Sequence, residues 1–222
     1  MHKNRAPLLT SHHIIRDNYN EFLGSTKVHG ILSLIKYAVE NSVNVLNNTN
    51  FPVIKVKIKT YKEKPDNISI TVKDNGSGCY GDMGSKLNPL DPTKESTDVG
   101  SMKIPHTDSN VGGLYIINAC SSRLEIRTKT GIDHERQYKF TDGFNEVNRI
   151  FRYNELDKSP GTTIVFSPDL RMLKDDLINI FNMRVMIKSY LKGIIDKNND
   201  IELHYTWNSE NTIILNKRRK VK

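Results

Sequence analysis

Apolar residues recur every three or four positions over about 26–47, which predicts one long amphipathic helix. Its predicted buried stripe consists of Val28, Ile31, Leu32, Ile35, Val39, Ser42 and Leu46. A second stripe of the same helix carries Tyr37, Asn41 and Asn44, each about one turn from the next. We therefore expect this row of polar side chains to face a ligand.

The pattern then changes to strict alternation of apolar and polar residues. It predicts strands at Val53–Lys59 and Ile68–Lys73, joined as a hairpin through Lys62–Asn67. The second strand leads into Asp74–Gly78, a turn that contains two glycines. Glycine lets backbone approach a ligand closely, and a carboxylate at a strand end can accept hydrogen bonds from an amino group. The helix and this turn together predict a binding site.

The rest of the chain alternates between helical and extended patterns. Residues 75–111 show little periodicity, and loops of that length inside a domain are often functional. The pattern at Asn145–Asn154 fits neither helix nor strand clearly. The other predicted helices are Ser11–Asn18, Leu114–Cys120 and 174–196, and the other predicted strands are Arg123–Lys129, Arg136–Phe140, Gly161–Phe166, Ile201–Trp207 and Thr212–Leu215. This order predicts an α/β two-layer sandwich, a mixed β-sheet with helices on one face.

Composition narrows the class of protein. The 222 residues suffice for one large domain, or for a domain with an appendage. The net charge of +8 suits nucleic acid, but it also fits the lysine-rich composition that AT-rich genomes produce. The basic run 217–222 is open to three interpretations: a DNA contact, a localisation signal or a solvated terminus. Two cysteines make neither a metal site nor a disulfide framework, and no apolar run reaches membrane length. We expect a reduced cytoplasmic protein without membrane partners, or a nuclear one if the source is eukaryotic.

Two stretches resemble the signature boxes of one superfamily. Glu40–Val43 resembles the N-box, and Asp74–Gly78 resembles the Asp-x-Gly-x-Gly box, of the GHKL ATPases, which include gyrase, the large heat-shock chaperone, histidine kinases and MutL. The resemblance implies the Bergerat (GHKL) fold and a site for ATP and Mg²⁺, with Asn41 on the magnesium and Asp74 on the adenine amino group. The residues that it implies for cofactor binding are Asn41, Asp74, Gly76, Gly78, Gly112, Gly113 and Thr162.

Within the superfamily, the flanking residues are most similar to the ATP-binding domain of the B subunit of DNA gyrase and topoisomerase IV. The motifs that carry this similarity are Phe22–Thr26, Glu40–Val43, Asn118–Ser121, Gly161–Phe166 and Pro168-Asp169, and it covers most of 19–205. The B subunit of topoisomerase VI shares the two main boxes and is the next most similar. The resemblance implies three partners: an A-type topoisomerase subunit, DNA contacted through its phosphates, and a second copy in a possible homodimer.

The same resemblance divides the chain into parts. It implies an N-terminal strap at 1–24 and a nucleotide-binding domain at 25–208, whose ATP lid lies at about 79–113. The remaining 209–222 would be a closing strand and basic tail, where the transducer domain of these topoisomerases begins. In the family that domain supplies a lysine to the γ-phosphate.

Several positions depart from the family pattern. Tyr37 stands where gyrase has the glutamate that acts as general base, and a phenol with a pKa near ~10 accepts protons poorly at neutral pH. Glu40 is adjacent in sequence to Asn41, but it lies about 100° around the helix from it. Val45 and Ser77 replace a Glu–Arg pair that spans the family's pocket. The family's glycine-rich phosphate segment is also reduced here to Gly112 and Gly113.

These features leave three hypotheses open. The first is a gyrase-B-like ATP-binding domain of a type II topoisomerase whose hydrolysis is weakened or lost, in effect a pseudo-ATPase. The second is an active ATPase subunit that drives strand passage, with the missing base supplied elsewhere. The third is a non-enzymatic scaffold or regulator that binds a topoisomerase-like partner.

Overall fold

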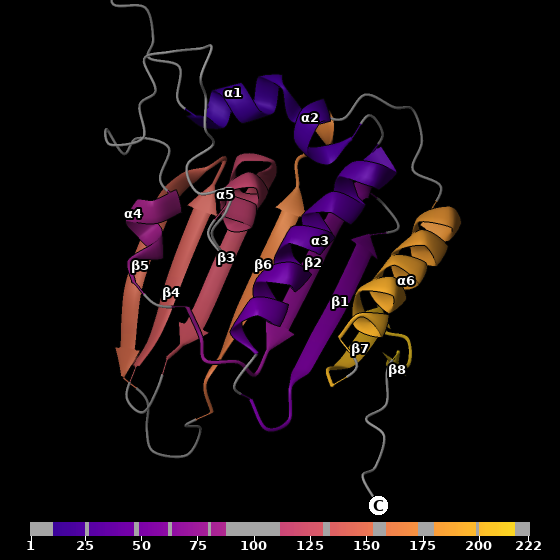
Figure 1. Ribbon diagram of the computed structural model, residues 1–222. Helices are drawn as coiled ribbons and strands as arrows, with labels where there is room; N and C mark the ends of the chain where they lie inside the picture. The colour runs from indigo at the N-terminus through magenta and orange to yellow at the C-terminus, as the bar shows by residue number, and fades with distance from the viewer. Residues whose placement is uncertain are drawn as a thin grey trace, which may run out of the picture.

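An eight-stranded sheet with helices on one of its faces forms the framework of the protein (Figure 1). The computed structural model describes residues 11–24, 27–46, 49–61, 64–79, 81–87, 112–130, 134–152, 159–172, 180–198 and 200–215. The predicted α/β sandwich with a mixed sheet is confirmed.

The strands do not follow their chain order in the sheet. Their bounds are β1 Val53–Tyr61, β2 Lys64–Asp74, β3 Ser121–Lys129, β4 His134–Thr141, β5 Phe144–Arg152, β6 Gly161–Pro168, β7 Glu202–Trp207 and β8 Ile213–Ile214. The order across the sheet is β5-β4-β3-β6-β2-β1-β7-β8. β1 pairs in parallel with β7, whereas the other described pairs are antiparallel. The C-terminal end of β2 therefore lies beside the N-terminal end of β6, near the centre of the sheet.

Helices α3, α5 and α6 lie across one face of the sheet, and α1 and α2 lie at one end of it (Figure 1). The bounds are α1 Ser11–Asp17, α2 Tyr19–Leu23, α3 Lys27–Val45, α4 Met83–Leu87, α5 Gly112–Ala119, the 3-10 helix η2 Leu170–Met172 and α6 Ile180–Asp196. The other face of the sheet carries no described helix.

One continuous core fills the space between helices and sheet. Along β1 the apolar residues Ile54, Val56 and Ile58 are buried under the helices, while the lysines between them are exposed on the open face. Tyr205 and Trp207 of β7 join this core. The helical stripe of α3 is displaced from the predicted one, because Leu34 and Ala38 are fully buried whereas Val28 and Leu32 are only partly so.

Some predicted elements needed correction. The ambiguous Asn145–Asn154 overlaps strand β5, which begins at Phe144, and the weak pattern of this strand follows from its place at the sheet edge. Helix α4 lies inside the segment predicted to lack periodicity. Asp82 starts it by accepting hydrogen bonds from the backbone N–H of Gly84 at 2.9 Å and the hydroxyl of Ser85 at 2.7 Å. Short capped helices of this kind carry no periodic signal.

Candidate functional site

The carboxyl group of Asp74 is the centre of a buried polar cluster at the end of β2. The residue is only 3% exposed. Its Oδ1 accepts hydrogen bonds from the backbone N–H of Gly76 at 3.0 Å and of Thr162 at 3.1 Å. Its Oδ2 accepts one from the Ser42 hydroxyl at 2.9 Å. A carboxylate has about four acceptor positions, so these three donors leave capacity on Oδ2 for one more.

Burial governs the protonation of this carboxyl group. Desolvation raises the pKa of Asp74, and the donors at Gly76, Ser42 and Thr162, together with the charge of Lys73, act in the opposite direction. An acceptor that is held rigidly and desolvated in this way can bind an amino group of a ligand strongly.

The two glycines of the turn after Asp74 are required by close backbone contacts. A Cβ on Gly76 would lie 2.6 Å from the carbonyl oxygen of Val45 at the end of α3. Gly78 has a φ of +79°, and its Cβ would lie 2.1 Å from the carbonyl oxygen of Lys129. The turn is thus wedged between α3 and β3. Ser77 donates its N–H to the carbonyl oxygen of Val45 at 3.2 Å. The two positions that depart from the pattern of the resembled family are therefore neighbours.

Beside the carboxyl group, three side chains from separate segments form a second polar group. The backbone N–H of Cys79 donates to Thr128 Oγ1 at 2.6 Å, and the Thr128 and Thr162 hydroxyl oxygens are 3.4 Å apart. The thiol of Cys79 lies 3.7 Å from Thr162 Oγ1. Burial raises the pKa of this thiol, so it is protonated at neutral pH.

Asn41 brings an unsatisfied amide to the same place. It is only 4% exposed, and its Nδ2 has no hydrogen-bond acceptor in the described part of the chain. Its polar neighbour is the Cys79 thiol. A buried amide whose polar neighbour is only a weakly accepting thiol is costly, which marks this position as one that a ligand can complete.

Tyr37 lies on α3 one turn before Asn41, and its side chain contacts α2 and α5. Its hydroxyl donates to the carbonyl oxygen of Phe22 at 3.2 Å, and burial, followed by the charge of Glu40, raises its pKa. Its ring side contacts the start of α5, where a Cβ on Gly113 would lie 3.1 Å from the Cβ of Tyr37. Gly112, the first residue of α5, is buried.

The predicted row of polar side chains on α3 is only partly correct. Asn41 faces the cluster, but Asn44 is exposed and lines a groove of about 430 Å³ between α3 and α6. Glu40 lines the same groove, and its Oε1 lies 3.9 Å from Nζ of Lys36. The reason is that α3 turns Leu34, Ala38 and Asn41 toward the sheet, which leaves positions 40 and 44 on the outer side.

The structure therefore gathers Asn41, Asp74, Gly76, Gly78 and Thr162 from the predicted site. The residues that the sequence interpretation missed are Ser42, Thr128, Cys79 and Gly161, whose Cβ would lie 2.4 Å from the Asp74 carbonyl oxygen. For Ser42 and Thr128 a signal existed, since each is a polar residue at a position whose periodicity indicates burial. Most of the predicted lid, at 80 and 88–111, and the basic run 217–222 lie outside the described residues.

Within the described ranges, no group of three or more His, Cys, Asp or Glu residues is arranged to hold a metal ion. In the same ranges, no helix is both long and apolar enough to cross a bilayer.

Comparisons with solved structures address the fold. No protein-family model and no curated protein matches the sequence. The ATP-binding domain of topoisomerase IV from Francisella tularensis, solved with a small-molecule inhibitor, is similar with a TM-score of 0.58 and 19% identity, over 92% of this chain and 94% of that one. The 43K ATPase domain of gyrase B from Thermus thermophilus, solved with an aminocoumarin, gives a TM-score of 0.62 and 18% identity over 95% of this chain. This chain spans about half of that domain, 52% of its length. The chain therefore has the GHKL fold of the ATP-binding domains of gyrase B and topoisomerase IV.

Proposed function

We propose that this protein is a gyrase-B-like domain that binds ATP with magnesium and hydrolyses it slowly or not at all. The observation that carries the proposal is the Asp74 carboxyl group, buried at a strand end and oriented by donors from α3, the glycine turn and β6. Its remaining acceptor capacity suits the exocyclic amino group of adenine. Thr162 and the polar group around Thr128 adjoin it.

The residues present also fit the metal and phosphate end of a nucleotide. Asn41 supplies a buried amide whose Nδ2 could donate to a phosphate oxygen and whose Oδ1 is of the type that Mg²⁺ accepts as a ligand. Gly112 and Gly113 begin α5, and backbone N–H groups at a helix N-terminus favour phosphate. The bound nucleotide would supply the phosphoanhydride bonds, and the protein residues named here would hold and orient it.

Slow hydrolysis follows from the groups around position 37. A general base must lose its proton near the working pH, whereas burial raises the pKa of Tyr37 and its hydroxyl donates to the Phe22 carbonyl group. Glu40 faces the groove between α3 and α6, away from the cluster. Neither residue is placed to activate a water molecule.

The topoisomerase context belongs to the same proposal. On it, residues 1–24 act as a strap, 79–113 as the lid and 209–222 as the connection toward a transducer. An A-type subunit and a second copy of the chain are the protein partners in this context.

Calorimetry and steady-state turnover test the proposal together. Wild-type protein is titrated with MgATP and with a non-hydrolysable analogue, and phosphate release is then measured alone, with duplex DNA, and with DNA plus an A-type subunit. The Asp74→Asn variant provides the background for both assays. Binding without turnover above that background is the expected result.

The other outcomes separate the alternatives. Turnover in any of the mixtures that disappears in Asp74→Asn would show an active ATPase and overturn the claim about hydrolysis. A folded protein that binds neither nucleotide would overturn the nucleotide site, and the scaffold hypothesis would then remain.

A further inference from the structure

The open face of the sheet holds the excess positive charge of the described chain. Nine Lys and Arg residues and three Glu residues face outward from β1 to β7, an excess of six positive charges. The other described residues contain twelve Lys or Arg and twelve Asp or Glu, so they are neutral in sum. The basic residues of the open face are Lys55, Lys57, Lys59, Lys73, Arg123, Arg127, Lys129, Lys139 and Arg149, and the acidic ones are Glu125, Glu135 and Glu202.

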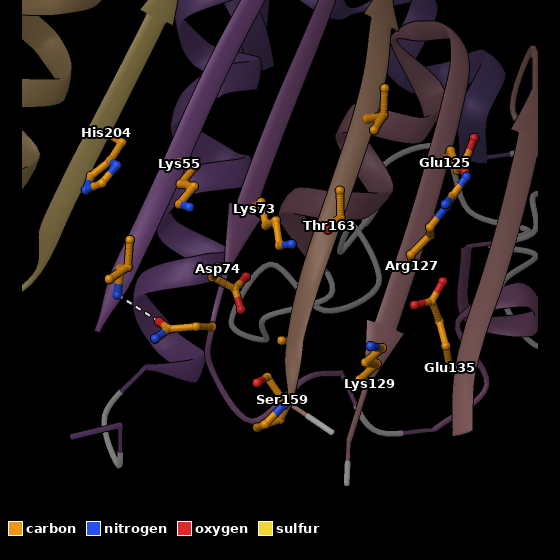
Figure 2. A pocket seen from close by; sticks show the side chains of 15 residues that line it. Lys55, Lys73, Asp74, Glu125, Arg127, Lys129, Glu135, Ser159, Thr163 and His204 are labelled. Carbon is orange, nitrogen blue, oxygen red and sulfur yellow. Dashed lines mark hydrogen bonds and ion pairs between the residues drawn. The ribbon is translucent and has the colours of Figure 1, made fainter. Parts of the chain in front are cut away.

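Part of this face is hollowed into a basin of about 800 Å³ (Figure 2). The strand registers place its basic residues in a row across the sheet. Arg127 is opposite Thr163, Thr163 is opposite Lys73, Lys73 is opposite Lys55, and Lys55 is beside His204. Neighbouring strands are about 4.8 Å apart, so the row is a continuous band of cationic and polar groups.

Asp74 lines the basin and is held by the three donors described above, and two other acidic residues in or beside the basin are paired. Glu125 Oε1 accepts hydrogen bonds from Arg127 at 2.6 Å and from Gln137 at 2.7 Å. Glu202 pairs with His204. In contrast, no ion pair or hydrogen bond with a described residue holds the ammonium group of Lys55 or Lys73, although the charge of Lys73 acts on the nearby Asp74. The two lysines are opposite each other in the register of β1 and β2. Like charges at directly opposed positions destabilise a sheet. An anionic partner would relieve this repulsion.

We propose that this open face binds the phosphate backbone of a nucleic-acid duplex. On β1, Lys55, Lys57 and Lys59 repeat every second residue, or about 6.8 Å, and a duplex presents phosphates continuously along its outside. Single strands are bound by stacking on aromatic rings, and no Phe, Tyr or Trp lines the basin. The exposed Phe144 of β5 lies at the edge of the face. The face offers charge without a base-reading element, so binding is independent of sequence and sensitive to salt.

The basin adjoins the nucleotide site, because Asp74 lines the basin and also belongs to that site. Asp74 joins Ser42 on the helix-covered side, whereas Lys55 and Lys73 project from the other. The experiment is therefore done without nucleotide.

Fluorescence anisotropy of a short labelled DNA duplex of random sequence measures the affinity of the full chain at several salt concentrations. The test variant is Lys55→Gln/Lys73→Gln. The matched control is Lys188→Gln/Lys192→Gln, which removes the same charge from exposed positions of α6. Each phosphate contact contributes about 0.9 to the slope of log affinity against log salt, so the test variant should lose about 1.8. The ratio of wild-type to variant affinity should then be about 12-fold larger at about 50 mM than at about 200 mM salt.

Controls separate this result from misfolding and from other binding surfaces. The melting temperature of the test variant should equal or exceed that of the wild type, because a like-charge pair is removed. Variants in which the basic residues of 217–222 are changed to Gln are measured with and without Lys55→Gln/Lys73→Gln, and the face substitutions should lower the slope in both backgrounds.

Three results would overturn the proposal. The first is a salt slope in the test variant equal to that of the wild type. The second is loss of the effect when the 217–222 residues are neutralised. The third is equal affinity for polyglutamate with the same lysine dependence, which would identify an acidic protein as the partner.

Discussion

Replacing Asp74 by Asn changes the proposed adenine contact while keeping the shape of the side chain. In the wild type, Oδ1 accepts from two backbone N–H groups and Oδ2 accepts from Ser42. Because both backbone groups are donors, the Asn side chain must keep its oxygen at the Oδ1 position. Its NH₂ group then takes the place of Oδ2, where it can donate to the Ser42 oxygen but cannot accept from a ligand.

The expected loss of affinity follows from this exchange of acceptor for donor. A hydrogen bond to a charged group contributes about 1.5–3 kcal/mol, and the amino group of the ligand would be left unsatisfied in a buried site. At about 1.4 kcal/mol per tenfold change, Asp74→Asn should weaken ATP binding by about 10- to 150-fold.

The effect of the same substitution on stability has a definite sign. Burial raises the pKa of Asp74, so the folded protein holds this proton more tightly than the unfolded chain does. The contribution of the group to stability is therefore full below the ordinary aspartate pKa of about 3.9 and is lost as pH rises through the raised value. Asn does not titrate. The free energy of unfolding of the wild type should thus fall relative to that of Asp74→Asn as pH rises above about 4.

Two measurements check this pair of expectations. Calorimetry gives the affinity, and urea unfolding at a series of pH values gives the stability difference. Asp82→Asn is the matched control, since Asp82 also accepts from backbone N–H groups but caps α4 on the surface. It should leave ATP affinity unchanged. If Asp74→Asn binds ATP as the wild type does, or loses stability relative to it as pH rises, the reasoning about this carboxyl group is wrong.

Other substitutions and labels give sharper local tests. The pKa of Asp169 is lowered chiefly by its hydrogen bonds to the exposed Arg171, so Asp169→Asn should lower the unfolding free energy by no more than about 1 kcal/mol at neutral pH. Urea unfolding should show that difference vanish as pH falls through the lowered pKa. Gly78→Ala, with its Cβ 2.1 Å from the Lys129 carbonyl oxygen at a φ of +79°, should lower the unfolding free energy by at least about 1–3 kcal/mol in the same assay. Maleimide should label Cys79 slowly and more slowly still with ATP present, while Cys120, buried with a pKa of about 12, stays unmodified by mass spectrometry. Equal labelling of Cys79 with and without ATP would count against the nucleotide site.

Much of the fold could be predicted because burial follows the period of the regular elements. β1 alternates lysine with isoleucine or valine, and α3 carries a wide apolar stripe, so both were placed within a few residues. β5 could not be assigned, because an edge strand that is exposed along much of its length has no apolar alternation to detect. Helix α4 depends on one capping side chain, Asp82, and five residues give no period.

The site could be predicted only as far as its residues lie in contiguous motifs. Asn41 and Asp74 stand in such motifs, and the structure brings them to one cluster. Thr128 and Cys79 reach it through strand pairing and the backbone of the glycine turn, which local sequence does not encode. The sequence pattern also does not predict that positive charge is concentrated on the open face. Alternation along one strand shows which lysines face together, but the registers between strands decide that Lys55 and Lys73 meet.

Tyr37 takes part in the packing of the N-terminal helices, and these contacts give the residue a structural role. Tyr37 joins α3 to the end of α2 through the Phe22 carbonyl oxygen, and its Cβ meets Gly113 at the start of α5. A glutamate carboxylate could not donate this hydrogen bond to the carbonyl oxygen. Tyr37, which stands where the resembled family has its base, therefore makes a helix-to-helix contact instead. On the proposed function, a domain that holds ATP without cleaving it benefits from that exchange, because the segment beside the nucleotide is fixed rather than poised for chemistry.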